Sequence, residues 1–209
     1  MTKPDLTLIA VLVDRSGSMA ATKTDAEGGL RAFLAEQRAA PGETLVTLAQ
    51  FDTEFETVHA ERPIADVPDY TLAPRGMTAL HDAVGKLVTE VGERLAAKPE
   101  DARPSRVYVV IVTDGEENSS REWSAEQVRE AVETQRRDYG WEFVFIGANQ
   151  DAVLTGQSLG VPVAAAATYD TSRTADTYAV ASAAVTRSRV TGQGVGFTDD
   201  EREQVSGGG

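Results

Sequence analysis

Three short runs of apolar residues constrain the fold of this chain more than any other feature. They are LTLIAVLV at residues 6–13, RVYVVIVT at 106–113 and EFVFI at 142–146. A nearly continuous apolar run of this length, rich in valine and isoleucine, is typical of a strand that is buried on both faces. Such strands belong to parallel sheets, whose two faces are covered by helices. The sequence therefore predicts a mostly parallel sheet at the centre of the fold.

Segments with a helical pattern separate these runs, as a parallel sheet requires. Ser124 and Gln127 form a capping box, which predicts the start of a helix, and Gly140 lies where that helix should stop. Alternation of strands and helices is typical of a three-layer, doubly wound α/β fold. The helices are predicted at about residues 24–37, 78–97, 124–140, 151–159 and 174–189.

Two further strand-like runs, at residues 45–51 and 55–59, are separated only by Asp52-Thr53-Glu54. A connection this short joins antiparallel strands, so the pair is predicted to form a hairpin. Residues 163–168 are predicted as an edge strand. The simplest division of the 209 residues is one domain over 1–190 and a flexible, Gly-rich and charged tail over 191–209.

Charge and cysteine content exclude several classes of protein. The chain has 33 acidic and 20 basic side chains, a formal net charge of -13, and no cysteine. This acidity argues against binding to nucleic acid or to an anionic membrane surface. The lack of cysteine excludes a disulfide scaffold, a thiolate metal site and a cysteine nucleophile, and it fits a cytoplasmic protein.

Polar residues follow the first buried run, where a ligand of such a sheet is expected. Ligands bind at the carboxyl ends of parallel strands. The first run continues as Asp14-Arg15-Ser16-Gly17-Ser18, in which every second residue carries a side-chain oxygen. Alternate residues of an extended segment point the same way, so Asp14, Ser16 and Ser18 can face one point.

Two more oxygen-bearing residues are expected at the same edge of the sheet. Thr78 lies at the start of the longest predicted helix, and Asp114 follows the run at 106–113. Two carboxylates and three hydroxyl groups suit Mg²⁺, Mn²⁺ or Ca²⁺ rather than zinc or copper. The five residues supply fewer ligands than the six that Mg²⁺ takes, which leaves a position open for an outside ligand.

The DxSxS segment at 14–18, followed by Thr78 and then by Thr113-Asp114-Gly115, resembles the metal-ion-dependent adhesion site of von Willebrand factor A domains. The resemblance extends over residues 6–189 in the order of elements, and it is closest to the stand-alone bacterial or phage-encoded type. It implies a Rossmann-like sheet of six strands, mostly parallel, with one antiparallel edge strand. The predicted hairpin would supply that edge.

The resemblance also implies a function and a role for each residue. Domains of this family bind a divalent cation, usually Mg²⁺, and use it to capture a glutamate or aspartate of a protein partner. Direct coordination is implied for Ser16, Ser18 and Thr78, and direct or water-mediated coordination for Asp14 and Asp114. The expected protein is thus a cation-dependent binding module without catalysis. Neither the identity of the partner nor the oligomeric state can be predicted from the sequence.

An enzymatic alternative remains open, in which Asp14 is the nucleophile of a Mg²⁺-dependent phosphohydrolase. The haloacid dehalogenase pattern would place a second aspartate where this chain has Ser16, and no P-loop motif is present. A phosphatase screen would separate the two functions.

The roles of several neighbouring residues also stay open. Arg15 and Arg75 either steer an acidic partner or balance local charge. Glu116, Glu117 and Asn118 form a solvated acidic loop, tune the site or recognise a basic partner. Asn149 and Asp151 are better explained as turn and helix-capping residues than as part of the rim of the binding face. In some relatives, filling of the metal site is linked to movement of the last helix, which here is the one at 174–189.

Overall fold

A computed structural model describes residues 2–148 and 151–206. Its centre is one six-stranded sheet with the order β3-β2-β1-β4-β5-β6. All neighbouring strands pair in parallel except β2 and β3, which are antiparallel, so both the mostly parallel sheet and its antiparallel edge are confirmed. The strands are β1 (Lys3–Asp14), β2 (Glu43–Phe51), β3 (Phe55–Pro63), β4 (Pro104–Thr113), β5 (Glu142–Ala148) and β6 (Ala166–Tyr169).

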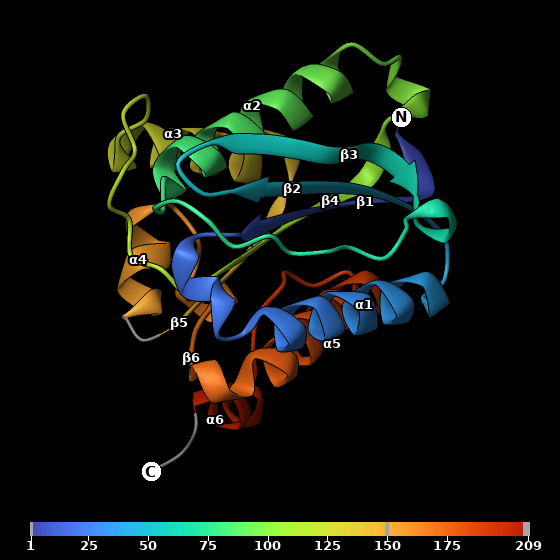
Figure 1. The fold of residues 1–209 in the computed structure, drawn as a ribbon. Coiled ribbons are helices and arrows are strands. Elements are labelled where there is room, and N and C mark those ends of the chain that lie inside the picture. The colour runs from blue at the N-terminus through green and yellow to red at the C-terminus, as the bar shows by residue number, and fades with distance from the viewer. Residues whose placement is uncertain (1, 149–150, 207–209) are drawn as a thin grey trace.

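Helices cover both faces of the sheet and complete the three layers (Figure 1). Helices α2 and α3 lie on one face, and α1, α5 and α6 on the other. The short α4 packs against β5 and β6. The helices are α1 (Lys23–Ala39), α2 (Leu80–Ala96), α3 (Ala125–Tyr139), α4 (Ala152–Ser158), α5 (Thr174–Thr191) and α6 (Asp199–Ser206).

The core is built on the two longest apolar runs of the sequence. Strands β1 and β4 are the central pair of the sheet, and their residues from Leu8 to Leu12 and from Val109 to Val112 are fully buried. Helices cover both faces of these two strands, so side chains that point to either face are buried. This explains why the runs are continuously apolar rather than alternating. The position of the central strands follows directly from their sequence.

Local signals in the sequence also predicted where helices begin and end. The Ser124 hydroxyl accepts a hydrogen bond from the backbone N–H of Gln127, and the Gln127 side chain accepts one from the N–H of Ser124, which confirms the capping box. Gly140 ends α3 in the left-handed conformation, with φ of 66°. The predicted edge strand at 163–168 is shorter than expected, because residues 163–165 form a 3-10 turn and β6 begins at Ala166.

The segment after α5 packs against the domain, in contrast to the predicted flexible tail. Val195, Phe197 and Val205 are buried, and residues 199–206 form α6. The Arg202 guanidinium donates hydrogen bonds to three backbone carbonyls in residues 163–166. Arg187 of α5 forms an ion pair with Glu201. The scattered apolar residues gave no helical period, so this packing could not be foreseen.

Within the described residues, no helix is long and apolar enough to cross a membrane.

Candidate metal centre

Three separate segments bring the predicted site residues to one edge of the sheet. Asp14 is the last residue of β1, and Ser16 and Ser18 follow it in the turn that leads toward α1. Asp114 directly follows β4, the neighbour of β1. Thr78 lies two residues before the start of α2. Since β1 and β4 are parallel, their carboxyl ends meet, as the sequence predicted.

Hydrogen bonds connect the oxygens of these residues. The Oγ atoms of Ser16 and Ser18 lie 2.9 Å apart, and the Ser18 hydroxyl donates to Asp114 Oδ1 at 2.6 Å. The proton of Ser18 is therefore used on Asp114, so Ser16 is the donor to Ser18. The backbone N–H of Ser16 donates to Asp14 Oδ1 at 2.7 Å. The DxSxS segment thus bends so that its side chains meet the end of β4.

Thr78 and Asp14 flank the backbone of Gly115. A Cβ atom at Gly115 would lie only 2.5 Å from Thr78 Oγ1 and 3.4 Å from Asp14 Oδ2. Thr113, the last residue of β4, donates to Asp14 Oδ2 at 2.5 Å. Any side chain at position 115 would therefore displace the Thr78 hydroxyl. The structure brings all five predicted residues together around the ends of β1 and β4.

Burial dominates the electrostatics of the two aspartates. The Asp14 side chain is fully buried, and this raises its pKa to about 6, although hydrogen bonds from Thr113 and Ser16 oppose the shift. Burial also raises the pKa of Asp114, against the hydrogen bond from Ser18. Among the described residues, no lysine or arginine forms an ion pair with either carboxyl group. The two acids are close enough for their charges to interact, and in the described part of the chain no cationic side chain pairs with them.

Arg15, between Asp14 and Ser16, has a structural role. Its guanidinium is buried and bonds to Asp52 Oδ2 at 2.8 Å and to Glu56 Oε2 at 2.8 Å. Burial would raise the pKa of Asp52, but hydrogen bonds from Arg75 and Glu54, together with the charge of Arg15, hold it below its usual value. Of the two interpretations left open, charge balance fits Arg15, because its side chain is not exposed to a partner.

The loop before Thr78 is held in place on this charged cluster. The backbone N–H of Arg75 donates to Arg15 O at 2.8 Å, and that of Met77 donates to Thr53 Oγ1 at 3.1 Å. Gly76 between them has φ of 68° and packs against Asp52, so a glycine is needed there. Side chains of this fixed loop nevertheless face outward: 58% of the Arg75 side chain and 52% of Met77 are exposed.

The acidic loop after Asp114 is an anchor for Thr78. The Thr78 N–H donates to Asn118 Oδ1 at 3.0 Å, and the Asn118 N–H donates back to Thr78 O at 3.0 Å. Glu117 accepts hydrogen bonds from the backbone of His81 and Ser120, and these bonds lower its pKa against the effect of burial. Glu117 is partly buried and Asn118 is exposed, but hydrogen bonds connect both to residues 78–81, so they fix the start of α2.

Asp82 is a residue that the sequence analysis missed. Its carboxylate accepts the backbone N–H groups of Arg121, Glu122 and Trp123 at 2.8–2.9 Å. These bonds hold its pKa below the usual value although the side chain is buried. An aspartate in the first turn of a helix was visible in the sequence, but its partners lie about 40 residues away. No local pattern could have indicated them.

Of Asn149 and Asp151, which the sequence analysis considered for the rim of the binding face, only Asp151 can be placed. Asp151 Oδ1 accepts the backbone N–H of Leu154 at 3.1 Å and caps α4, which supports its interpretation as a helix cap. Asn149 lies outside the described residues.

Comparison with known structures identifies the fold. No known family model and no curated protein matches the sequence. Proximal thread matrix protein 1 from the mussel byssus is a similar structure, with a TM-score of 0.62, 16% identity, and coverage of 84% of this chain and 45% of that chain. Another structure of that protein, described as having a zinc-occupied metal-ion-dependent adhesion site, has a TM-score of 0.59, 15% identity, and coverage of 85% of this chain and 47% of that chain.

A structure from another organism shows a similar likeness. The von Willebrand factor type A protein from Catenulispora acidiphila has a TM-score of 0.57 and 13% identity, over 88% of this chain and 43% of that one. This chain spans less than half the length of the chains it matches here. At these identities the likeness concerns the fold, and the strand order and the antiparallel edge agree with it. The chain has the fold of a von Willebrand factor type A domain.

Proposed function

We propose that this protein is a binding module that captures a carboxylate of a protein partner through a divalent cation. The ion would be held by Asp14, Ser16, Ser18, Thr78 and Asp114, and Mg²⁺ is the proposed ion, with Mn²⁺ and Ca²⁺ as alternatives. When bound, the cation supplies an electrophilic centre to which an outside carboxylate can bind. The resemblance of the DxSxS, threonine and TDG motifs to an adhesion site supports this assignment.

One observation carries the proposal: the oxygens of three distant segments are gathered, and no lysine or arginine of residues 2–148 and 151–206 forms an ion pair with their carboxylates. Ser18 bridges Ser16 and Asp114, and Gly115 places the Thr78 hydroxyl beside Asp14. This all-oxygen set fits a hard cation. The two carboxylates, which repel each other and lack an arginine or lysine among the described residues, would gain a counter-charge from it.

The remaining residues would hold the ligands in place. Asn118 fixes the backbone of Thr78 through two hydrogen bonds, and Thr113 and the Ser16 N–H fix both carboxylate oxygens of Asp14. Ligands whose own orientation is fixed by hydrogen bonds bind a metal with less loss of conformational freedom. Met77 and Arg75, exposed on the neighbouring loop, would contact the segment of the partner around its carboxylate.

The test is calorimetric titration with MgCl₂, MnCl₂ and CaCl₂, followed by partner capture in Mg²⁺ and in EDTA. Thr78→Ala and Ser18→Ala should each weaken ion binding by at least tenfold while the circular dichroism spectrum stays unchanged. Ser158→Ala, which changes an exposed serine in α4, is the matched control and should bind as the wild type does. Absence of ion binding by the wild-type protein would refute the proposal.

The phosphohydrolase alternative receives less support from the same geometry. A nucleophilic carboxylate must be reachable, but the Asp14 side chain is fully buried and both its oxygens accept hydrogen bonds. A phosphatase screen at saturating Mg²⁺ remains the direct test, and turnover that is lost in Asp14→Asn would favour the enzyme.

Two further assignments are proposals: the cellular location, as the sequence analysis gave it, and the domain boundary, in a revised form. The cytoplasmic location rests on the lack of cysteine alone. For the domain boundary, we propose an end at about residue 206 rather than 190, because Val195, Phe197 and Val205 bury their side chains against the domain.

A further inference from the structure

A short turn between β2 and β3 contacts both of the loops from which the proposed metal centre would take its hydroxyl ligands. Residues 52–54 form this Asp52 turn. The first ligand loop, residues 14–18, contains the two serines, and the second ligand loop, residues 75–79, contains Thr78. Only 3% of the Asp52 side chain is exposed, so its carboxylate faces the protein rather than solvent.

The first ligand loop is attached to this turn through Arg15, which stands between Asp14 and Ser16. Arg15 Nε donates to Asp52 Oδ2 at 2.8 Å, and the Arg15 backbone N–H donates to Phe51 O at 2.7 Å. Both charged side chains are buried, so water and salt screen this ion pair less than they would at the surface. The backbone that carries Asp14 and Ser16 is therefore held at the end of β2.

The second ligand loop is attached to the same turn on both sides of Thr78. Arg75 Nε donates to Asp52 Oδ2 at 2.8 Å, and the backbone N–H of Ala79 donates to Asp52 O at 2.9 Å. Between them, the Met77 N–H donates to the threonine hydroxyl of the turn at 3.1 Å. Thr78 is thus placed by contacts that its neighbours make with three consecutive residues.

One carboxylate joins the two ligand loops. Asp52 Oδ2 accepts the hydrogen bonds of both arginines, while Asp52 Oδ1 accepts the backbone N–H of Glu54 at 2.8 Å. The loops also meet directly, because the Arg75 N–H donates to Arg15 O at 2.8 Å. The two guanidinium groups carry like charges, and the shared carboxylate offsets their repulsion. The distance between the hydroxyl ligands of the two loops therefore depends on Asp52.

The spacing of the ligands matters more for a small cation than for a large one. Mg²⁺ requires near-octahedral geometry with oxygens at about 2.0–2.1 Å, whereas Ca²⁺ accepts oxygens at about 2.3–2.6 Å in flexible arrangements. We propose that Asp52 is a positioning residue that fixes the two ligand loops relative to each other and thereby gives the centre a preference for Mg²⁺ over Ca²⁺. This role rests on the proposed function, because it concerns the ion of the same centre.

Calorimetric titration of the wild type and of Asp52→Asn with MgCl₂ and with CaCl₂ tests this role. Asparagine offers one acceptor oxygen in place of two, so either the Glu54 N–H or the two arginines would face its NH₂ group. The dissociation constant for Mg²⁺ should rise by roughly tenfold or more, and that for Ca²⁺ by less than about threefold. Arg75→Gln, at an exposed side chain, removes one attachment of the second ligand loop and should shift the ratio of the two constants the same way by a smaller factor.

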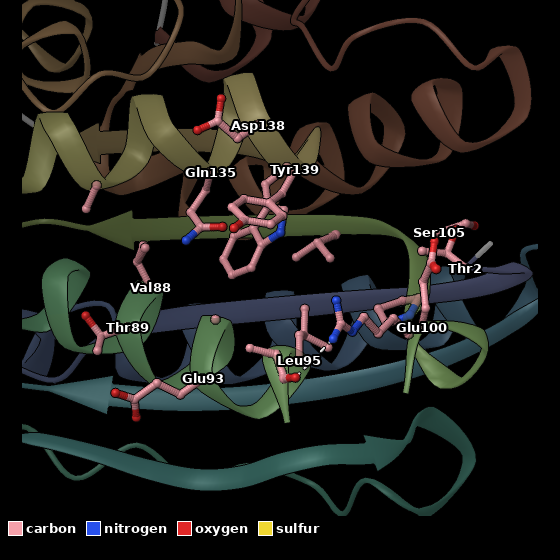
Figure 2. A pocket seen from close by; sticks show the side chains of 17 residues that line it. Thr2, Val88, Thr89, Glu93, Leu95, Glu100, Ser105, Gln135, Asp138 and Tyr139 are labelled. Carbon is pink, nitrogen blue, oxygen red and sulfur yellow. Dashed lines mark hydrogen bonds between the residues drawn. The ribbon is translucent and has the colours of Figure 1, made fainter. Parts of the chain in front are cut away.

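Two control variants separate this role from effects of charge and of stability. Asp138→Asn removes the exposed ion pair with Arg137 on α3, where Asp138 lines a pocket formed by α2, α3 and the first residues of β4 (Figure 2). Arg202→Gln removes hydrogen bonds that hold the C-terminal segment. Both residues lie outside the ligand loops and the Asp52 turn, so both variants should keep the wild-type ratio of the two constants.

Amide hydrogen exchange of the ion-free protein measures the attachment itself. In Asp52→Asn the N–H groups of Arg75 and Ala79 should exchange severalfold faster than in the wild type, while those of β4 keep their rates. Three results overturn the role of Asp52 and leave the proposed function intact: a wild type that does not prefer Mg²⁺, an Asp52→Asn variant that keeps the wild-type ratio, or exchange that is unchanged or faster across the whole sheet. Absence of ion binding by the wild type would refute both. Should Asp52→Asn fail to fold, Arg75→Gln decides by the same two measurements.

Discussion

Substitution of Asp82 by asparagine tests whether the loop after β4 is held by a charged anchor. The Asp82 carboxylate is 8% exposed and accepts the backbone N–H groups of Arg121, Glu122 and Trp123. Two of these bonds, from Glu122 and Trp123, go to one oxygen, and the bond from Arg121 goes to the other. Asparagine can keep the first pair, but its NH₂ group would then face the N–H of Arg121.

The expected loss of stability in Asp82→Asn follows from this arrangement of hydrogen bonds. A hydrogen bond to a charged group contributes about 1.5–3 kcal/mol, and an N–H left without an acceptor adds a desolvation cost. We therefore expect Asp82→Asn to lower the free energy of unfolding by roughly 2–3 kcal/mol. The control is Asp25→Asn, because Asp25 also lies in the first turn of a 17-residue helix but is exposed. Its interaction with the helix dipole contributes about 0.3–1 kcal/mol.

Urea denaturation followed by far-ultraviolet circular dichroism measures both variants at pH 7 and at acid pH. The folded-state pKa of Asp82 is lowered, so its stabilisation is complete above the unfolded value of about 4 and is lost as the pH falls through the folded value. The difference between wild type and Asp82→Asn should therefore shrink below about pH 4. Two results would refute the role of Asp82 as a charged anchor. One is an equal loss of unfolding free energy in Asp82→Asn and Asp25→Asn at pH 7. The other is a difference between wild type and Asp82→Asn that stays the same at acid pH.

Four further substitutions test the packing around the same sheet. Gly115→Ala should weaken Mg²⁺ binding by at least tenfold in calorimetry, because its Cβ atom would lie 2.5 Å from the Thr78 hydroxyl. Gly29→Ala should destabilise by about 1–3 kcal/mol in urea, because its Cβ atom would lie 2.5 Å from the Tyr178 ring. In contrast, Tyr178→Phe should be neutral or stabilising by up to about 1 kcal/mol, because the buried hydroxyl has no hydrogen-bond partner among the described residues. Arg202→Gln should lower stability by about 1–3 kcal/mol, and an unchanged urea midpoint would show that the C-terminal segment adds nothing to the fold.

The sequence predicted the sheet and the gathering of the site residues because both depend on short patterns. A strand that is buried on both faces has a continuous run of apolar residues in its sequence. The DxSxS segment directly follows such a run, and its first, third and fifth side chains point the same way. Asp82 and Asn118 could not be assigned in the same way, since each acts on backbone groups about 40 residues away. Phe197 was missed for a related reason: two apolar residues among glycines, Val195 and Phe197, show no helical period. Only the fold shows that both are buried and that the Phe197 N–H donates to Ala164 O, just before β6.

The buried and partly buried carboxylates at the site edge fall into two groups, and the difference supports the proposed choice of metal ligands. Asp52, Asp82 and Glu117 have lowered pKa values, because arginine side chains or several backbone N–H groups compensate their charge. Asp14 and Asp114 have raised pKa values, because hydroxyl groups and a single N–H do not offset their burial. Asp14 is buried and Asp114 is partly buried, and acids withdrawn from water near each other are costly unless a counter-charge compensates them. The first group therefore builds the loops around the site, and the second is the pair to which a cation would bind.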